Sequence, residues 1–292
     1  MPLNLPINDF DRGSPPGRLY VVGTPIGNRG DITLRALETL KNADLIAAED
    51  TRHTARLLTH YGIKTALISY HDFNEKERTA QLIIRLRQGA SIALVSNAGT
   101  PSVSDPGYAL ITAAITAKIP VIPIPGPSAA VTALSAAGLP TDTFVFAGFP
   151  AKKKAKRLRE LNLLCHEERT VIFYESPRRL PALLDELAAV FGDRYAVLSR
   201  ELTKIHEEFI RGRLSEILAV LKQRTTLKGE CTLLVTGRRE EAASVFPSLQ
   251  AELRQKLKSG QGRLSDIVRE MAIRYNVSKN EIYKEALKIK RN

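Results

Sequence analysis

The sequence contains little cysteine and no long apolar run. Its two cysteines, Cys165 and Cys231, have neither a metal-binding spacing nor a disulfide framework, which favours a reducing cytoplasm. The most apolar stretch, residues 109–125, is broken by Lys118 and three prolines, so no transmembrane helix is expected. The first residues lack a basic start followed by an apolar core, so no secretory signal is expected either.

The common signatures of nucleotide and hydrolase chemistry are also missing. Gly23, Gly27 and Gly30 do not form G-x-G-x-x-G, and no P-loop pattern is present, which argues against a dinucleotide or a nucleoside triphosphate. The His206-Glu207-Glu208 segment lacks the H-E-x-x-H spacing, so no metal site is expected. There is no G-x-S-x-G elbow to support a serine hydrolase.

Basic residues, by contrast, are in excess. The 292 residues carry a formal net charge of +12, and residues 247–292 hold eleven Lys and Arg against five Asp and Glu. A second basic cluster consists of Lys152, Lys153, Lys154, Lys156, Arg157 and Arg159. Two such clusters favour a nucleic-acid partner over a surface that is merely soluble, and the attraction should weaken steeply with salt.

The most informative stretch is residues 91–107, SIALVSNAGTPSVSDPG. A run of β-formers, Ile92 to Val95, leads into a loop of small residues, and an apolar helix pattern follows from Tyr108. Such a loop lies at the carboxyl end of a parallel sheet, where open α/β sheets bind ligands. Small side chains let the backbone approach a ligand closely. A tight connection without a ligand explains this loop equally well.

Strands and helices alternate through the first half of the chain, which predicts a mostly parallel sheet covered on both faces. The pattern then begins again, which predicts a second α/β domain and a ligand cleft between the two. The expected strands are 19–22, 45–48, 66–69, 92–95 and 121–124, then 143–147, 170–174, 195–199 and 231–236. The expected domains are a loose tail at 1–16, α/β domains at 17–125 and 126–240, and a small, basic, all-α domain at 246–292.

Three helix starts have recognisable capping residues. Asp31 is expected to cap a helix through Leu40, and Asn74 with Glu77 resembles a capping box. Ser176 and Pro177 form a cap and first-turn pair for the helix that Gly192 ends.

Charged pairs follow several of the predicted strands, and each has two interpretations. Glu49-Asp50 could act as a base, or could be a charge pair at a helix N-terminus. The segment 200–204 could be a site or a local salt-bridge network. Arg178 and Arg179 could hold a phosphate or could simply be solvated.

Several of these loops resemble one known family, the tetrapyrrole-methylase-like (class III) methyltransferases. The resemblance runs from about residue 17 to the end and is strongest to members that methylate bacterial small-subunit ribosomal RNA. The matching segments are VGTPIGN (22–28), AEDTR (48–52), SNAGTPSVSDPG (96–107), PIPGPSA (123–129), FYESPRR (173–179), RELTKIHEE (200–208), LKGECTLLV (227–235) and SKNEIYKEAL (278–287).

The resemblance implies two α/β domains with S-adenosyl-L-methionine in the cleft between them, and a homodimer. The residues it assigns to the cofactor are Pro25, Asn97, Ala98, Gly99, Thr100, Ser102, Val103, Ser128, Ala129, Tyr174 and Cys231. It further implies 2′-O-methylation of a cytidine ribose in 16S ribosomal RNA of the small subunit, in the cytoplasm.

Within that activity, ionisable residues at the expected strand ends are candidates for the acceptor side. Glu49, Asp50, Glu201 and Lys204 are the catalytic candidates, with Asp50 or Glu201 expected to accept the hydroxyl proton. The residues expected to bind RNA are Arg52, Lys152, Lys153, Lys154, Arg157, Arg178 and Arg179, together with the C-terminal helices.

The sequence departs from the family at three positions. Asn97 stands where the family usually has Asp, Arg178 where it has His, and Pro150 directly follows Gly148-Phe149 where Leu-Pro is usual. Two alternatives stay open: an enzyme of the same fold that acts on a tetrapyrrole or a protein side chain, and a non-catalytic protein that binds cofactor and RNA. The basic C-terminal segment and AEDTR argue against the first, and Asn97 is the best argument for the second.

Overall fold

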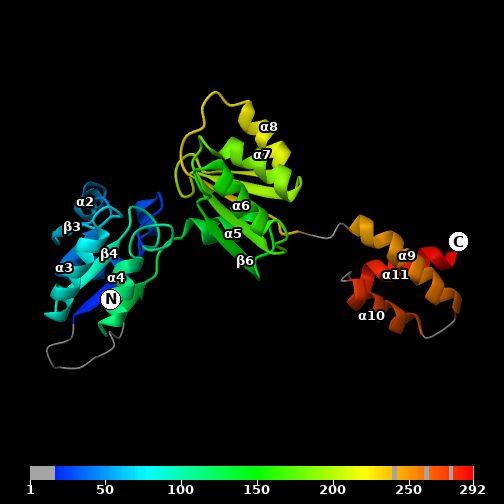
Figure 1. The fold of residues 1–292 in the computed structure, drawn as a ribbon, viewed down its shortest axis with the longest axis horizontal. Coiled ribbons are helices and arrows are strands. Elements are labelled where there is room, and N and C mark those ends of the chain that lie inside the picture. Colours follow the sequence, from blue (N-terminus) through cyan, green and yellow to red (C-terminus); the bar gives the residue numbers. More distant parts are fainter. Residues whose placement is uncertain (1–16, 239–241, 260–262, 276–278, 292) are drawn as a thin grey trace, which may run out of the picture. The chain divides into compact units, whose positions relative to one another are not determined.

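A computed structural model describes residues 17–238, 242–259, 263–275 and 279–291. The expected tail at 1–16 lies outside these residues. The chain divides into two compact units, one up to Gly237 and one from Arg238 onward. The first unit contains two five-stranded sheets, and the second contains helices (Figure 1). The finer domain boundaries given above stay a prediction.

The first sheet is parallel throughout and has the strand order β3-β2-β4-β1-β5. Its strands are β1 (Arg18–Val22), β2 (Leu45–Ala48), β3 (Leu67–Ser69), β4 (Ser91–Val95) and β5 (Val121–Ile124). The helices around it are α1 (Leu34–Asn42), α2 (Thr51–His60), α3 (Glu75–Arg87) and α4 (Tyr108–Thr116).

Both faces of this sheet are covered, as the continuous apolar strands require. Leu40 of α1 and Leu58 of α2 belong to the buried cluster on one face, and Leu86 of α3 and Leu110 of α4 belong to the cluster on the other. Because all the strands are parallel, their carboxyl ends share one edge. The loops after β1, β2, β4 and β5 therefore lie along that edge.

The second sheet differs from the expected parallel pattern. Its strand order is β6-β7-β10-β8-β9, and only the β6–β7 pair is parallel. The strands are β6 (Phe144–Gly148), β7 (Thr170–Glu175), β8 (Tyr195–Arg200), β9 (Glu208–Arg213) and β10 (Cys231–Val235). Helices α6 (Lys154–Leu164), α7 (Leu180–Phe191) and α8 (Leu214–Lys222) pack on one face, and α5 (Ala129–Ala137) packs on the other.

Strand β9, which the sequence analysis missed, accounts for this difference. It has the sequence EFIRGR and pairs antiparallel with β8 at the edge of the sheet. Its charged residues, Glu208, Arg211 and Arg213, obscure the alternation that marks a half-buried strand. A short loop joins β8 to β9, and short connections join antiparallel neighbours.

Of the three expected helix starts, the Asp31 cap is wrong, Asn74 is at the expected position without the expected hydrogen bond, and the third helix begins later than expected. Thr33, not Asp31, caps α1, because its side chain accepts the Ala36 N–H. Asn74 precedes α3 but makes no cap hydrogen bond, since its side chain instead accepts the His71 N–H and donates to Ser69. Ser176 begins a turn, and α7 itself starts at Leu180. Gly192, with φ +80°, ends α7 as expected.

The second unit consists of α9 (Ala242–Ser259), α10 (Leu264–Tyr275) and α11 (Lys279–Arg291). Leu253, Met271, Ile282 and neighbouring apolar residues form its own buried cluster, so the three helices pack on one another. Among the residues described, no helix combines the length and the hydropathy that crossing a membrane requires.

Candidate active site

The loops at the carboxyl edge of the first sheet surround a cavity of about 350 Å³, which is large enough for a small-molecule ligand. The second sheet closes it with the end of β7 and the start of β10. Its lining residues are Ile26, Glu49, Asn97, Ala98, Gly99, Thr100, Val103, Ser104, Asp105, Ser128, Ala129, Phe149, Tyr174, Glu175, Ser176, Pro177, Gly229, Glu230, Cys231 and Thr232.

Backbone contacts hold two of the lining loops together. Thr24 and Gly99 exchange two hydrogen bonds, of 2.8 and 3.0 Å, and the Thr24 hydroxyl lies 3.2 Å from the Ser96 carbonyl oxygen. Gly99 has φ +77°, a conformation in which a side chain would be strained. A Cβ on Gly126 would lie 2.8 Å from the Cα of Gly23, so the loops after β1 and β5 also touch through glycine. The edge of the cavity is thus a rigid backbone surface.

Tyr174 contributes the hydroxyl that joins β7 to the start of α5. It accepts a hydrogen bond of 3.0 Å from the Ala130 N–H at the start of α5. Its ring packs edge-on against Phe146 and Phe149, with centroids 4.9 and 5.5 Å apart. Burial raises the pKa of the Tyr174 hydroxyl, so it stays protonated.

Nine of the eleven residues expected to bind a cofactor line the cavity. Pro25 and Ser102 are not among them; the neighbouring Ile26 takes the place of Pro25. Ser102 has φ +67° and its N–H bonds to the Pro106 carbonyl, so it shapes the loop. Burial raises the pKa of the Cys231 thiol to about 12, so Cys231 is a neutral lining group and not a nucleophile.

The acceptor-side candidates do not all reach the cavity. Glu49 lines it and accepts the Asn97 N–H at 3.1 Å. Asp50 does not line it; it caps α2 and binds Arg52, and hydrogen bonds from Arg52 lower its pKa to about 2. This is the helix-terminal charge pair of the alternative interpretation, and such an acidic group is a poor proton acceptor at neutral pH.

Glu201 and Lys204 form a tight ion pair of 2.8 Å behind the cavity wall. Lys204 also binds Glu230, which does line the cavity, at 3.0 Å. The hydrogen bond from Lys204 lowers the pKa of Glu201, so Glu201 also is poorly suited to accept a proton. The charges at 200–204 are therefore a salt-bridge network at the margin of the cavity.

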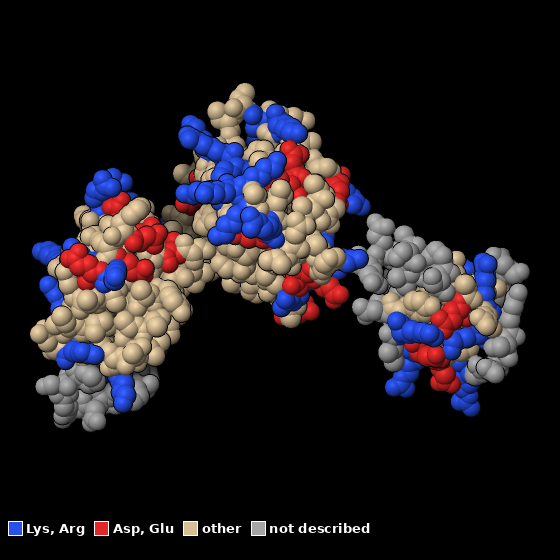
Figure 2. Space-filling model, viewed as in Figure 1, with Lys and Arg blue, Asp and Glu red and all other residues tan. Residues whose placement is uncertain are grey.

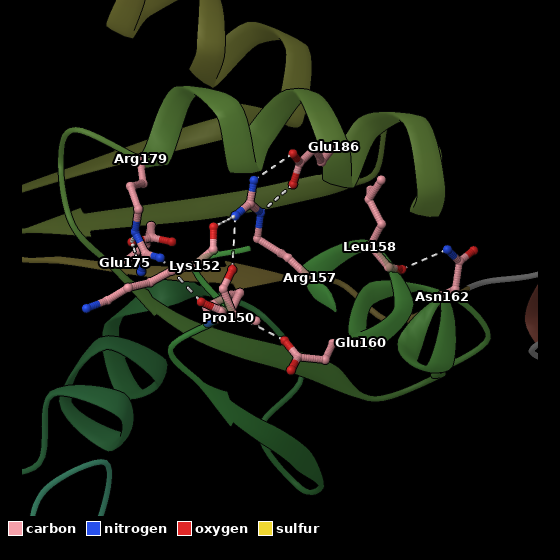
Figure 3. A network of polar contacts seen from close by, with 10 residues as sticks. Pro150, Lys152, Arg157, Leu158, Glu160, Asn162, Glu175, Arg179 and Glu186 are labelled. Atoms are coloured by element: carbon pink, nitrogen blue, oxygen red, sulfur yellow. Dashed lines mark hydrogen bonds and ion pairs between the residues drawn. The ribbon is translucent and has the colours of Figure 1, made fainter. Parts of the chain in front are cut away.

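Two of the arginines expected to bind RNA are engaged inside the protein (Figure 3). Arg157 is 9% exposed and makes two hydrogen bonds, of 2.6 and 2.8 Å, to Glu186. It also donates to the carbonyls of Ala151 and Lys152. This arrangement argues against RNA binding by Arg157, because its side chain faces the interior of the domain.

Arg179 bonds to Glu175 at 2.7 Å and approaches the Pro150 carbonyl, as Figure 3 also shows. Arg52 remains exposed but is paired with Asp50. Lys152, Lys153, Lys154 and Arg178 are exposed. On the face drawn in Figure 2, Lys and Arg gather over the region of α6 and α7, and this basic face is available to an anionic partner.

Several cavity residues escaped the sequence analysis, and three of them are carboxylates: Glu175, Asp105 and Glu230. Glu175 lies in FYESPRR and is 2% exposed; Asp105 lies in SNAGTPSVSDPG. Both motifs had been recognised, so their acidic residues could have been selected. Burial, aided by the charge of Glu49, raises the pKa of Asp105 to about 6.

Two buried polar atoms near the cavity have no hydrogen-bond partner among the residues described: Asn97 Oδ1 and Glu175 Oε2. Unpaired buried oxygens are costly and are commonly satisfied by a ligand or by water. Together with the small-residue loops, they suit a ligand that carries hydrogen-bond donors and an apolar body.

The fold and this cavity define a class of methyltransferase. Residues 18–218 match the family model of Tetrapyrrole (Corrin/Porphyrin) Methylases, and the chain belongs to this family. A solved uroporphyrin-III C-methyl transferase from Thermus thermophilus, complexed with S-adenyl homocysteine, has the same fold. Its TM-score is 0.53 at 18% identity, and the alignment covers 75% of this chain and 97% of that one.

Curated relatives place the chain more narrowly. It is 46% identical to a ribosomal RNA small subunit methyltransferase I of Micromonospora olivasterospora, over 92% of this chain and 86% of the relative. Another protein of that name, from Synechocystis, is 47% identical over 94% and 98% of the two chains. Within its family the chain thus groups with the small-subunit methyltransferases I. The expected family and two-domain α/β architecture with added C-terminal helices are confirmed.

Proposed function

We infer that this protein transfers a methyl group from S-adenosyl-L-methionine to 16S ribosomal RNA of the small subunit, at the 2′-oxygen of a cytidine ribose. The observation that carries this proposal is the cavity, because the segments shared with the ribosomal RNA methyltransferases converge on it from both sheets. The basic face over α6 and α7 gives an RNA substrate a place to bind.

The cofactor is proposed to occupy the cavity between Ala98, Gly99, Ala129 and Tyr174. Small residues and neutral Cys231 allow close packing around its adenosine and methionine parts. The unpaired oxygens of Asn97 and Glu175 are acceptors suited to its amino and hydroxyl groups. When bound, the cofactor supplies an activated methyl group on a sulfonium.

On the acceptor side, the protein must align the ribose and take up its hydroxyl proton. Glu49 lines the cavity and is proposed to orient the ribose. The Glu201–Lys204 pair is proposed to hold Glu230 at the cavity margin. The pair is therefore proposed to act as a positioning group. Asp50 and Arg52 are proposed to stabilise the start of α2, next to Glu49 in the chain.

RNA is proposed to contact Lys152, Lys153, Lys154 and Arg178, together with the basic unit that begins at Arg238. We further propose that the protein acts in the cytoplasm as a homodimer. The groove between α3 and α4 exposes Ile84 and Tyr108 and offers an apolar face for a second copy. A monomeric mass by light scattering would contradict the dimer.

The test uses radiolabelled S-adenosyl-L-methionine and small ribosomal subunits from cells that lack the methylation. The expected result is label in 16S ribosomal RNA, and none in subunits that already carry the methyl group. Deleting residues 246–292 should weaken RNA association and spare cofactor binding. Cofactor binding without labelled RNA would favour another acceptor, a tetrapyrrole or protein side chain, or a non-catalytic role. If the intact protein neither bound the cofactor nor labelled the RNA, the proposal would be refuted.

A further inference from the structure

Asp105 is placed at the cavity by a tightly organised loop. It lies at the end of the small-residue loop that begins at Ser96. Pro106 and Gly107 separate it from α4, and Gly107 has φ +141°. A Cβ on Gly107 would lie 2.9 Å from Leu94, so the backbone here is packed directly against strand β4. The Ser102 N–H bonds to the Pro106 carbonyl and closes the loop on itself. The position of Asp105 is therefore fixed by the backbone on both sides.

The ionisable and hydroxyl groups that interact with Asp105 come from four segments of the chain. Glu49 follows β2, Asp72 follows β3, Ser96 follows β4, and Tyr174 lies in β7. Two of these are carboxylates and two are hydroxyls. Among the groups that shift its pKa, none is a cation.

Each of the other carboxylates that line the cavity has a fixed partner on at least one of its oxygens. Glu49 accepts the Asn97 N–H, and Glu230 is paired with Lys204. Glu175 is paired with Arg179, and one of its oxygens also accepts the Ser176 N–H. No ion pair involves Asp105 within the described part of the chain.

We propose that Asp105 is the catalytic base of the methyl transfer. Its carboxylate accepts the proton of the ribose 2′-hydroxyl as the 2′-oxygen bonds to the methyl carbon. The bond between that carbon and the sulfonium sulfur breaks, and its electron pair stays on sulfur, which leaves a neutral thioether. This inference rests on the proposed function and names the residue that performs its proton transfer.

The chemistry of a base agrees with this environment. A general base works best when its pKa lies near the working pH, because it is then both deprotonated and basic enough to accept a proton. Burial and the like charge of Glu49 raise the pKa of Asp105 to about 6. Asp50, by comparison, has a pKa of about 2 and would be far weaker in this role.

The test compares full-length Asp105→Asn, Asp105→Glu and wild-type protein in single-turnover methylation of unmethylated small subunits. An exposed aspartate in the loop before β6 serves as the matched control, as Asp142→Asn. Asp105→Asn should lower the rate by about 10²- to 10⁴-fold, the usual contribution of a general base. Its dissociation constant for S-adenosyl-L-methionine should be unchanged, and Asp142→Asn should match the wild type in both.

The pH profile separates catalysis from a structural role. The wild-type rate should fall as the pH drops below about 6, because Asp105 becomes protonated there. Asp105→Glu should recover part of the rate and should still show the fall in rate at low pH (the acid limb of the profile). Asp105→Asn should lose this acid limb. Glu49→Gln should move the limb to lower pH, because it removes the like charge that raises the pKa of Asp105.

Three results would overturn the inference. A wild-type rate in Asp105→Asn would exclude a base at this position while leaving the proposed function intact. A parallel loss of cofactor binding and rate would mean that Asp105 holds the cofactor. If wild-type protein bound cofactor but labelled no ribosomal RNA, the proposed function would fail, and the role of Asp105 in it would fail as well.

Discussion

Replacing Arg157 should damage the folding of the second sheet domain and not its contact with RNA. Arg157 and Glu186 have side chains only 11% and 10% exposed, and they meet through two hydrogen bonds. Two further hydrogen bonds from Arg157 hold the carbonyls of Ala151 and Lys152. Arg157→Leu removes all four and leaves the Glu186 carboxylate buried without its cation.

The magnitude follows from that burial. Breaking a buried ion pair by removing one partner costs about 3–5 kcal/mol, because the remaining charge is desolvated and unpaired. For a domain of this size, that corresponds to a fall in Tm of about 6–20 °C. The double variant Arg157→Leu/Glu186→Leu should regain most of this loss, since it leaves no buried charge.

The assay is urea unfolding of the full chain followed by circular dichroism, alongside RNA binding at several salt concentrations. Lys154→Ala, an exposed neighbour on α6, is the control; it should change the free energy of unfolding by less than about 0.5 kcal/mol and weaken RNA binding. The reasoning is refuted if Arg157→Leu unfolds like the wild type and instead loses salt-dependent RNA affinity.

Two more predictions concern the hairpin of the second sheet and the rim of the cavity. Hydrogen bonds from Arg224, and then from Arg200, lower the pKa of Glu208 to about 2. The ionised Glu208 therefore contributes its full stabilisation above the ordinary carboxyl pKa, and this stabilisation is lost as the pH falls toward 2. Glu208→Gln should therefore be less stable than the wild type by about 1–3 kcal/mol at neutral pH in urea unfolding, with the difference shrinking in acid; a constant difference at all pH values would contradict this. Gly126→Ala should lower stability by about 1–3 kcal/mol and weaken cofactor binding in calorimetry, because its Cβ would lie 2.8 Å from Gly23; unchanged binding and stability would show that the two loops can separate.

The strands of the first sheet could be predicted because burial on both faces makes them continuous apolar runs. Leu45–Ala48 is buried at every position and was predicted with its observed bounds. Strand β9 could not be predicted in the same way, because an edge strand with charged residues lacks that signal. Because this strand was missed, the antiparallel pairing of the second sheet was not predicted either.

The loops in the sequence predicted the position of the cavity. They did not predict the roles of its charged residues. Arg157 was assigned to a basic cluster, but it lies one helical turn before buried Leu161 and shares the interior face of α6. Asp50 and Asp105 both follow strands, and no local pattern distinguishes a capping carboxylate from one with a raised pKa. The difference depends on Arg52 in one case and on burial with Glu49 in the other.

The most direct test of the central claim is to locate the methyl group after incubation of the protein with labelled S-adenosyl-L-methionine and unmethylated small subunits. Nuclease digestion and mass spectrometry of the 16S ribosomal RNA should recover the label as a 2′-O-methylated cytidine. Label on a base, on a ribosomal protein, or on no component of the subunit would contradict the claim.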